Sequence, residues 1–225
     1  MPMGMLRHPL FLWSFPMATK VDICNLALAV LGDTATVSSI DPPEGSAQAD
    51  HCARFYSMSV NEVLSQHPWS FALKRAKLAE MTIDVQGEGS ARYFACPPDC
   101  LRVHRLYGEG FDSRYFHYSI ETINGQRVIV TDAPSPWIKY VSSQVSESMF
   151  PPLFTTCVVH RLAAWLSGPL VVSPQSTEMA RKQVELYAQF LSRAIHADAS
   201  QQHKKEQSYS RFLEDYSGVM PDEFH

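Results

Sequence analysis

Cysteine and long apolar runs are scarce in this sequence, and each shortage excludes a class of protein. The chain has 225 residues and five cysteines, an odd and widely scattered set: Cys24, Cys52, Cys96, Cys100 and Cys157. Such a set does not provide the disulfide framework of a small secreted protein, so we expect free thiols packed as small core residues in a reducing cytoplasm. No apolar run reaches the roughly 18 to 20 residues that a membrane span needs, so we expect no membrane segment.

Charge is also sparse, and it is not of the sign that nucleic acids attract. Charged residues make up 19% of the sequence, and 19 Lys and Arg stand against 23 Asp and Glu, a formal net charge of -4. A nucleic-acid binder gains much of its affinity by neutralising phosphates, so we expect DNA to pass this protein without tight binding. Hydrophobic residues account for 45% of the chain, which predicts a folded core.

The motifs of common enzymes are missing as well. The sequence contains no Gly-x-Ser-x-Gly elbow, phosphate-binding loop, dinucleotide fingerprint or His-Glu-x-x-His pair. Asp41 and Glu44 form a carboxylate pair, but a helix cap explains both residues more simply. We therefore expect no catalytic residue, no cofactor and no enzymatic activity.

One pattern has the ligand types of a zinc site. Cys96 and Cys100 form one pair, and Cys157 and His160 form a second pair at a spacing that shares one helix face. The other residues of that face are apolar, and Pro97-Pro98 stiffens the first loop. We therefore expect these cysteines to pack in the core and expect no metal site. A small zinc-binding regulatory protein is the alternative.

Helical spacing marks two segments in the first third of the chain. Thr19 and Asp22 predict a cap for a buried helix that Gly32 ends. Asp41-Pro42, with Glu44 as an acidic partner, predicts the start of a second helix, which Pro68 ends.

Two more helices are predicted near the other end. One follows Pro151-Pro152 and is interrupted near Gly168-Pro169. The other and longest begins at Ser173-Pro174 and fades after about Ala199.

Between the two helix pairs the period changes from helical to alternating. Residues 116–122 and 127–131 alternate around Asn124-Gly125, which predicts a hairpin with a type I′ turn. A further strand is predicted at 137–141, whereas 73–81 has a mixed pattern. The middle of the chain is therefore predicted to be a small antiparallel β region.

Together these segments predict an α+β fold. We expect a four-helix bundle formed by residues 18–69 and 146–200, with a small antiparallel β domain of residues 70–145 inserted between its halves. Residues 1–17 are expected to be an extension that is untranslated or disordered, with Met17 as a candidate start.

Residues 201–225 are expected to form an extended C-terminal arm. They carry three Lys and Arg and five Asp and Glu. Phe212, Tyr216 and Phe224 lie among these polar residues with no core of their own, which predicts that they are anchors in a partner interface.

A basic cluster near two aromatic residues raises the question of nucleic-acid contact. Lys74, Arg75 and Lys77 follow Trp69 and Phe71, a combination that binds phosphates and bases in some proteins. Because the chain is acidic overall, we favour a solvated strand face or an ion-pair surface between subunits. Trp69 and Phe71 are then core anchors at the junction of the helical and β parts.

The order of several motifs resembles the tail tubular protein A family, the head-to-tail adaptors of short-tailed bacteriophages. The most specific pieces are Trp69-x-Phe71-Ala72 and Pro98-Asp99-Cys100-Leu101-Arg102-Val103. The resemblance covers about residues 18 to 200, and its other pieces follow in the family's order: the run Thr19 to Leu28 with Leu31-Gly32, Ile40-Asp41-Pro42, Ser46-Ala47, His67-Pro68, Tyr118 to Glu121, Ile129 to Asp132, and Leu162 to Leu166. Cys96 replaces a leucine of the family's pattern and Pro97 is extra, so the chain departs from the family in this turn.

The resemblance implies a structural virion protein without catalysis. Family members look like a helical bundle with a β domain and form a homo-oligomer, a twelvefold ring between the portal protein and the tail nozzle protein. It also implies a location in the virion neck after synthesis in the bacterial cytoplasm, with DNA passing through the ring without specific binding. The alternative within phages is a head- or tail-completion neck protein, which does not need the β part. A hairpin region folded as a separate lobe would favour the adaptor.

Overall fold

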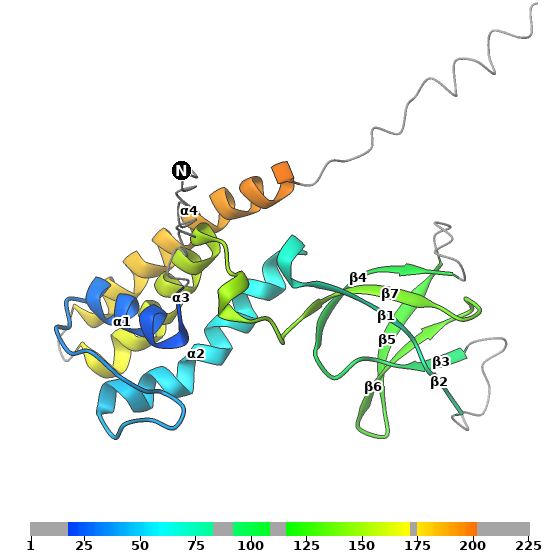
Figure 1. Ribbon diagram of the computed structural model, residues 1–225, viewed down its shortest axis with the longest axis horizontal. Coiled ribbons are helices and arrows are strands. Elements are labelled where there is room, and N and C mark those ends of the chain that lie inside the picture. Colours follow the sequence, from blue (N-terminus) through cyan, green and yellow to red (C-terminus); the bar gives the residue numbers. More distant parts are fainter. Residues whose placement is uncertain (1–17, 83–91, 109–115, 172–174, 202–225) are drawn as a thin grey trace, which may run out of the picture.

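The computed structural model describes residues 18–82, 92–108, 116–171 and 175–201, and it separates helices from strands along the molecule (Figure 1). Within these ranges the chain forms four α-helices and seven strands. The helices are α1 (Lys20–Val30), α2 (Ala47–Gln66), α3 (Pro152–Leu170) and α4 (Ser176–Gln201). The strands are β1 (Leu73–Lys77), β2 (Glu80–Met81), β3 (Arg92–Ala95), β4 (Cys100–Tyr107), β5 (Tyr118–Ile123), β6 (Gln126–Thr131) and β7 (Trp137–Ser142).

Helix α1 begins and ends where its sequence signals predict. The Thr19 hydroxyl accepts a hydrogen bond from the Asp22 N–H at 3.2 Å, and the Asp22 carboxylate accepts one from the Thr19 N–H at 2.8 Å. This reciprocal pair satisfies two of the backbone donors that a helix start leaves open. Gly32, with φ of +82°, lies just beyond the last turn, in a conformation that glycine adopts at little cost. The predicted limits of this helix are confirmed.

The predicted start of the second helix is wrong. Helix α2 begins at Ala47, because the Ser46 hydroxyl accepts a hydrogen bond from the Ala49 N–H at 3.2 Å and serves as the cap. Gly45, with φ of +97°, separates this cap from the residues before it. The Glu44 carboxylate instead accepts a hydrogen bond from the Ser38 N–H at 2.8 Å. Asp41 and Glu44 therefore belong to the preceding loop.

Helix α3 is the centre of the helical part. It packs against α1, α2 and α4, whereas α1 and α2 touch each other only slightly and α4 packs mainly on α3. Its buried side chains include Phe154, Leu162 and Leu166, each with no exposed surface. Pro169 lies in the last turn, and the helix continues to Leu170. The predicted start of the fourth helix, Ser173-Pro174, lies outside the described residues.

The strands form two antiparallel sheets. One sheet has the order β1-β7-β4 and the other has the order β2-β3-β6-β5. The predicted hairpin is confirmed: β5 pairs with β6 from Tyr118↔Thr131 to Ile123↔Gln126. Asn124 and Gly125 have φ of +51° and +77°, the left-handed values that a type I′ turn requires.

The predicted fold class needs correction. The chain is α+β, but it is not a four-helix bundle with a small inserted β domain. Over the described residues, the β part holds seven strands in two sheets. In the helical part α1, α2 and α4 each pack on α3, whereas in a four-helix bundle each helix packs on two neighbours. The sequence pattern predicted β5, β6 and β7 but not β1 and β3, which pair with the distant strands β7 and β6 and lack a clear alternation of their own.

Each part has a core of its own, and the two meet at a junction. The helical core contains residues of all four helices together with Trp69 and Val141, whereas Phe94, Ile129 and Ile138 belong to the core of the β part. In Figure 1 the strands extend away from the helices on the side where α2 ends. Over the described residues, no helix has the combined length and apolar character that crossing a membrane would require.

Candidate functional site

The predicted partner anchors, Phe212, Tyr216 and Phe224, lie outside the described residues. The described chain ends at Gln201, the last residue of α4. Gln201 lines a pocket at the junction of the helical and β parts, beside Trp69. The last described residue therefore lies at this junction.

Trp69 is the central aromatic side chain of this junction. It is 1% exposed, and its indole Nε1 donates a hydrogen bond to the Val63 carbonyl at 3.0 Å. Its ring meets the rings of Phe154 and His67 edge-on, with centroids 5.1 and 5.0 Å apart. A tryptophan in this environment cannot stack on a nucleotide base, and the prediction that Trp69 is a core anchor is confirmed.

Asp198 connects the end of α4 to the same junction. It is 5% exposed, and its carboxylate accepts hydrogen bonds from the Ser70 hydroxyl at 2.6 Å and from the Ser70 N–H at 3.1 Å. The second carboxylate oxygen lies 3.1 Å from His67 Nε2. A buried carboxylate is stable only when its oxygens are satisfied in this way. The arrangement fixes α4 to the segment that leads from α2 into β1.

A pocket of about 200 Å³ lies between these elements. Most of the side chains that line it are apolar, and Asp198 is the charged residue in its wall. The lining comes from the Trp69 segment, from the start of α3 and from the last turns of α4: Trp69, Pro151, Pro152, Leu153, Phe154, Ala194, Ala197, Asp198 and Gln201. Because Asp198 is already hydrogen-bonded to Ser70, the pocket offers a mainly apolar surface.

A second carboxylate, Asp99, organises the β side of the junction. It accepts hydrogen bonds from Ser142 Oγ at 2.7 Å, from Lys74 Nζ at 2.9 Å and from the Tyr140 hydroxyl at 3.1 Å. Burial alone would raise the pKa of Asp99, but the bonds from Ser142, Lys74 and Tyr140 outweigh burial and lower it. Burial together with the bond to Asp99 raises the pKa of Tyr140 to about 12. Lys74, one member of the predicted basic cluster, is thus part of an ion pair of the fold.

The four residues of the zinc pattern are not brought together. Cys96 and Cys100 pack in the core of the β part, and Cys157 is buried in the helical core. His160 Nδ1 lies 2.7 Å from the side-chain oxygen of Gln183 on α4, and its ring stacks on Phe190. Across the four described ranges, no three His, Cys, Asp or Glu side chains are grouped as a metal ion would need. The five cysteines are free thiols, and all except Cys96 are buried.

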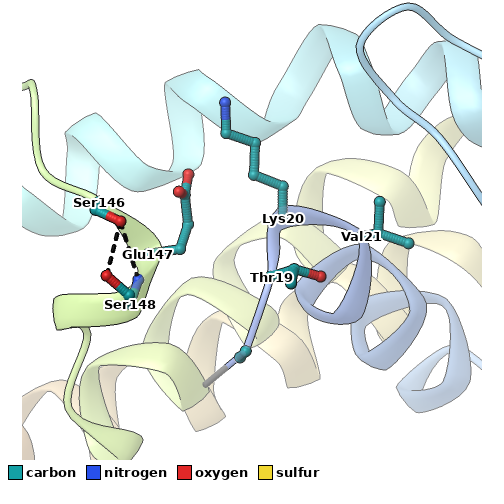
Figure 2. A pocket seen from close by; sticks show the side chains of 7 residues that line it. Thr19, Lys20, Val21, Ser146, Glu147 and Ser148 are labelled. Atoms are coloured by element: carbon teal, nitrogen blue, oxygen red, sulfur yellow. Dashed lines mark hydrogen bonds between the residues drawn. The ribbon is translucent and has the colours of Figure 1, made fainter. Parts of the chain in front are cut away.

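A wider pocket of about 330 Å³ lies between the start of α1 and the short helix Glu147–Met149 (Figure 2). Its polar groups take part in the local fold. Ser146 Oγ lies 2.8 Å from Ser148 Oγ, Thr19 belongs to the cap of α1, and Glu147 accepts a hydrogen bond from the Tyr56 hydroxyl at 3.3 Å. In Figure 2 the Lys20 side chain extends away from Ser146 and Ser148. The pocket therefore presents no group that is set up for proton transfer or nucleophilic attack.

Sequence reasoning identified Trp69 but missed Asp198 and Asp99. The burial of Asp198 could have been predicted, because it lies four residues after Ala194 on the buried side of α4. An unpaired charge at such a position would be costly, so its spacing also predicts a hydrogen-bond partner. Asp99 follows two prolines in a turn. Its hydrogen-bond partners Lys74, Tyr140 and Ser142 are more than 20 residues away in the sequence, so the residues beside Asp99 do not indicate them.

The chain was also compared with known proteins. Neither profiles of protein families nor the curated proteins give a match.

Proposed function

We propose that this protein is a structural virion protein: a subunit of the head-to-tail adaptor that joins the portal to the tail nozzle of a short-tailed phage. In this function it has no catalytic role, and DNA passes through the channel to which it contributes. The proposal starts from the motifs that resemble the tail tubular protein A family, such as Trp69-x-Phe71-Ala72 and Pro98-Asp99-Cys100-Leu101-Arg102-Val103.

The observation that carries the proposal is the separation of the β part from the helices. An adaptor and a head- or tail-completion neck protein can share helices, but only the adaptor needs a β lobe. Here the hairpin β5-β6 is part of a four-stranded sheet with its own buried residues, such as Ile129 and Phe94. This arrangement favours the adaptor over the alternative neck protein.

Charge and chemistry agree with a passive channel component. A net charge of -4 per subunit gives no electrostatic attraction to the phosphates of a duplex, so DNA can pass through the channel without tight binding. Trp69 is buried and therefore cannot stack on a base, and the charge of Lys74 is compensated by its ion pair with Asp99.

The predicted anchors of the C-terminal arm give the proposal its most specific test. Deleting residues 202–225 leaves α4 complete and should abolish binding to the purified portal ring, measured by co-sedimentation. A full-length variant with Phe212→Ser, Tyr216→Ser and Phe224→Ser should lose most of this binding. Full portal binding by both proteins would contradict the anchor assignment.

A further inference from the structure

Helix α1 exposes an apolar face. Leu26 and Val30 are 49% and 39% exposed and lie one helical turn apart, with the exposed Ala29 beside them. They are on the side opposite the one that α1 buries against the core. Single exposed apolar residues are ordinary, but a contiguous set on one helix side indicates a contact surface. We call this set the α1 face.

A second apolar face lies across α2 and α3. Met58 and Trp165 are 41% and 38% exposed, and the half-buried Phe55 stacks nearly parallel to Trp165 with centroids 6.1 Å apart. The Arg161 guanidinium lies 4.8 Å from the ring centroid of Trp165 and pairs with Glu62 at 2.6 Å. We call this set the α2-α3 face. Two of its members, Phe55 and Trp165, are aromatic and stack across the two helices.

The two faces carry opposite charge at corresponding places. Asp22 lies one turn before Leu26, and hydrogen bonds from the backbone and hydroxyl of Thr19 lower the pKa of its carboxyl, so that it stays anionic. The exposed Arg54 lies one turn before Met58. The charges of Arg161 and Glu62 neutralise each other within the α2-α3 face. The α1 face is therefore apolar with an anion, and the α2-α3 face is apolar with a cation.

We propose that the α1 face of one copy of this chain packs against the α2-α3 face of the next copy. Leu26 and Val30 then contact Met58 and Trp165, with Asp22 near Arg54. The contact is heterologous, so each copy uses both faces and repetition of the contact gives a ring when the rotation closes. The inference rests on the proposed function, because an adaptor ring requires such a contact.

A second copy fits these faces better than a contact of like with like. Pairing two α2-α3 faces would bring together two faces that each carry Arg54, and it would leave the α1 face exposed. The head-to-tail contact covers both apolar faces at once and brings opposite charges together. This difference makes the two arrangements separable by experiment.

The test uses two variants that each block one face. Leu26→Glu introduces a charge into the α1 face, Met58→Glu introduces one into the α2-α3 face, and Met149→Glu, at a position 56% exposed and outside both faces, is the matched control. Association is measured by sedimentation velocity and native mass spectrometry, alone and on the portal ring. The wild-type protein and Met149→Glu should assemble alike. Each blocking variant should need at least about tenfold more protein to associate.

Mixing the two blocking variants gives the decisive result. The Leu26→Glu protein keeps an intact α2-α3 face and the Met58→Glu protein keeps an intact α1 face. An equimolar mixture should therefore form one-to-one dimers and nothing larger. A Leu26→Glu protein that dimerises alone would show a like-with-like contact and overturn the proposal.

The outcomes separate this inference from the proposed function. If both blocking variants assemble as the wild-type protein does, alone or on the portal ring, the contact is wrong and the adaptor function is untouched. If the wild-type protein neither self-associates nor joins the portal ring, both are wrong. Thermal unfolding midpoints that match the wild-type value confirm that the variants are folded.

Discussion

Asp198 accepts a hydrogen bond of 2.6 Å from the Ser70 hydroxyl, which lies 128 residues earlier in the chain. This bond joins the last turn of α4 to the segment between α2 and β1. The geometry of the junction therefore depends on a contact between residues that lie far apart in the sequence.

Removing the Asp198 carboxylate should destabilise the protein. Asp198→Ala leaves the Ser70 N–H and hydroxyl without their buried acceptor, so we expect a loss of about 2–4 kcal/mol in the free energy of unfolding. Asp198→Asn keeps one acceptor oxygen and should lose less. Urea unfolding measures both, and an Asp198→Ala protein as stable as wild type would contradict the importance of this bond.

Trp69 should matter for stability and not for DNA. Trp69→Ala removes a fully packed indole, for which we expect a loss of about 3–5 kcal/mol in the free energy of unfolding. Trp69→Phe keeps an aromatic ring and loses the hydrogen bond to Val63, so its loss should be smaller. Urea unfolding and an electrophoretic DNA retention assay are run in parallel. Unchanged stability together with weaker DNA retention would reverse the assignment.

Asp99 should make part of the stability depend on acid pH. The pKa of Asp99 in the folded protein is below the ordinary value of 3.8. The contribution of Asp99 to the free energy of unfolding is therefore complete above that value and is lost as the pH falls through the folded pKa. Asp99→Asn removes this titration, and the free energy of unfolding should then fall less steeply below about pH 4. Asp132→Asn, at an exposed aspartate, is the control. Identical acid profiles for Asp99→Asn and the wild-type protein would contradict the prediction.

The cysteines should differ sharply in their reactivity. Cys24, Cys52, Cys100 and Cys157 are at most 2% exposed, and burial raises the pKa of Cys157 to about 12. Only Cys96 should react rapidly with a thiol reagent at pH 8, and the other four should react on unfolding. Mass spectrometry of the labelled protein counts the modified thiols. Protection of Cys96, Cys100 and Cys157 that is lost when a chelator is added would instead support the zinc alternative.

How much of the fold could be predicted depended on whether the signal was local. The cap of α1 and the Asn124-Gly125 turn each lie within a few residues of sequence, and both were predicted correctly. Strand β1 pairs with β7 in the register Leu73↔Val141, a partner that the sequence near Leu73 does not indicate. The predicted cap of α2 was Asp41, whereas the cap is Ser46, directly after Gly45 with φ of +97°.

The same limit applied to the site. Trp69 could be placed at the junction from its position between a helix end and the change of period. Asp198 and Asp99 satisfy their oxygens with partners that only the folded chain brings near. The exposed faces of the helices were not predicted either, because an apolar residue such as Leu26 or Met58 has the same sequence signal whether it is buried in the core or exposed at the surface.

The most direct test of the adaptor function is native mass spectrometry of the 25.3 kDa protein alone and after mixing with its portal ring. We expect the mass of the portal ring to increase by about twelve copies of this chain, the number that the resemblance to the tail tubular protein A family implies. An unchanged portal mass, particularly with one zinc ion in the mass of the free subunit, would contradict the account and favour the regulatory alternative.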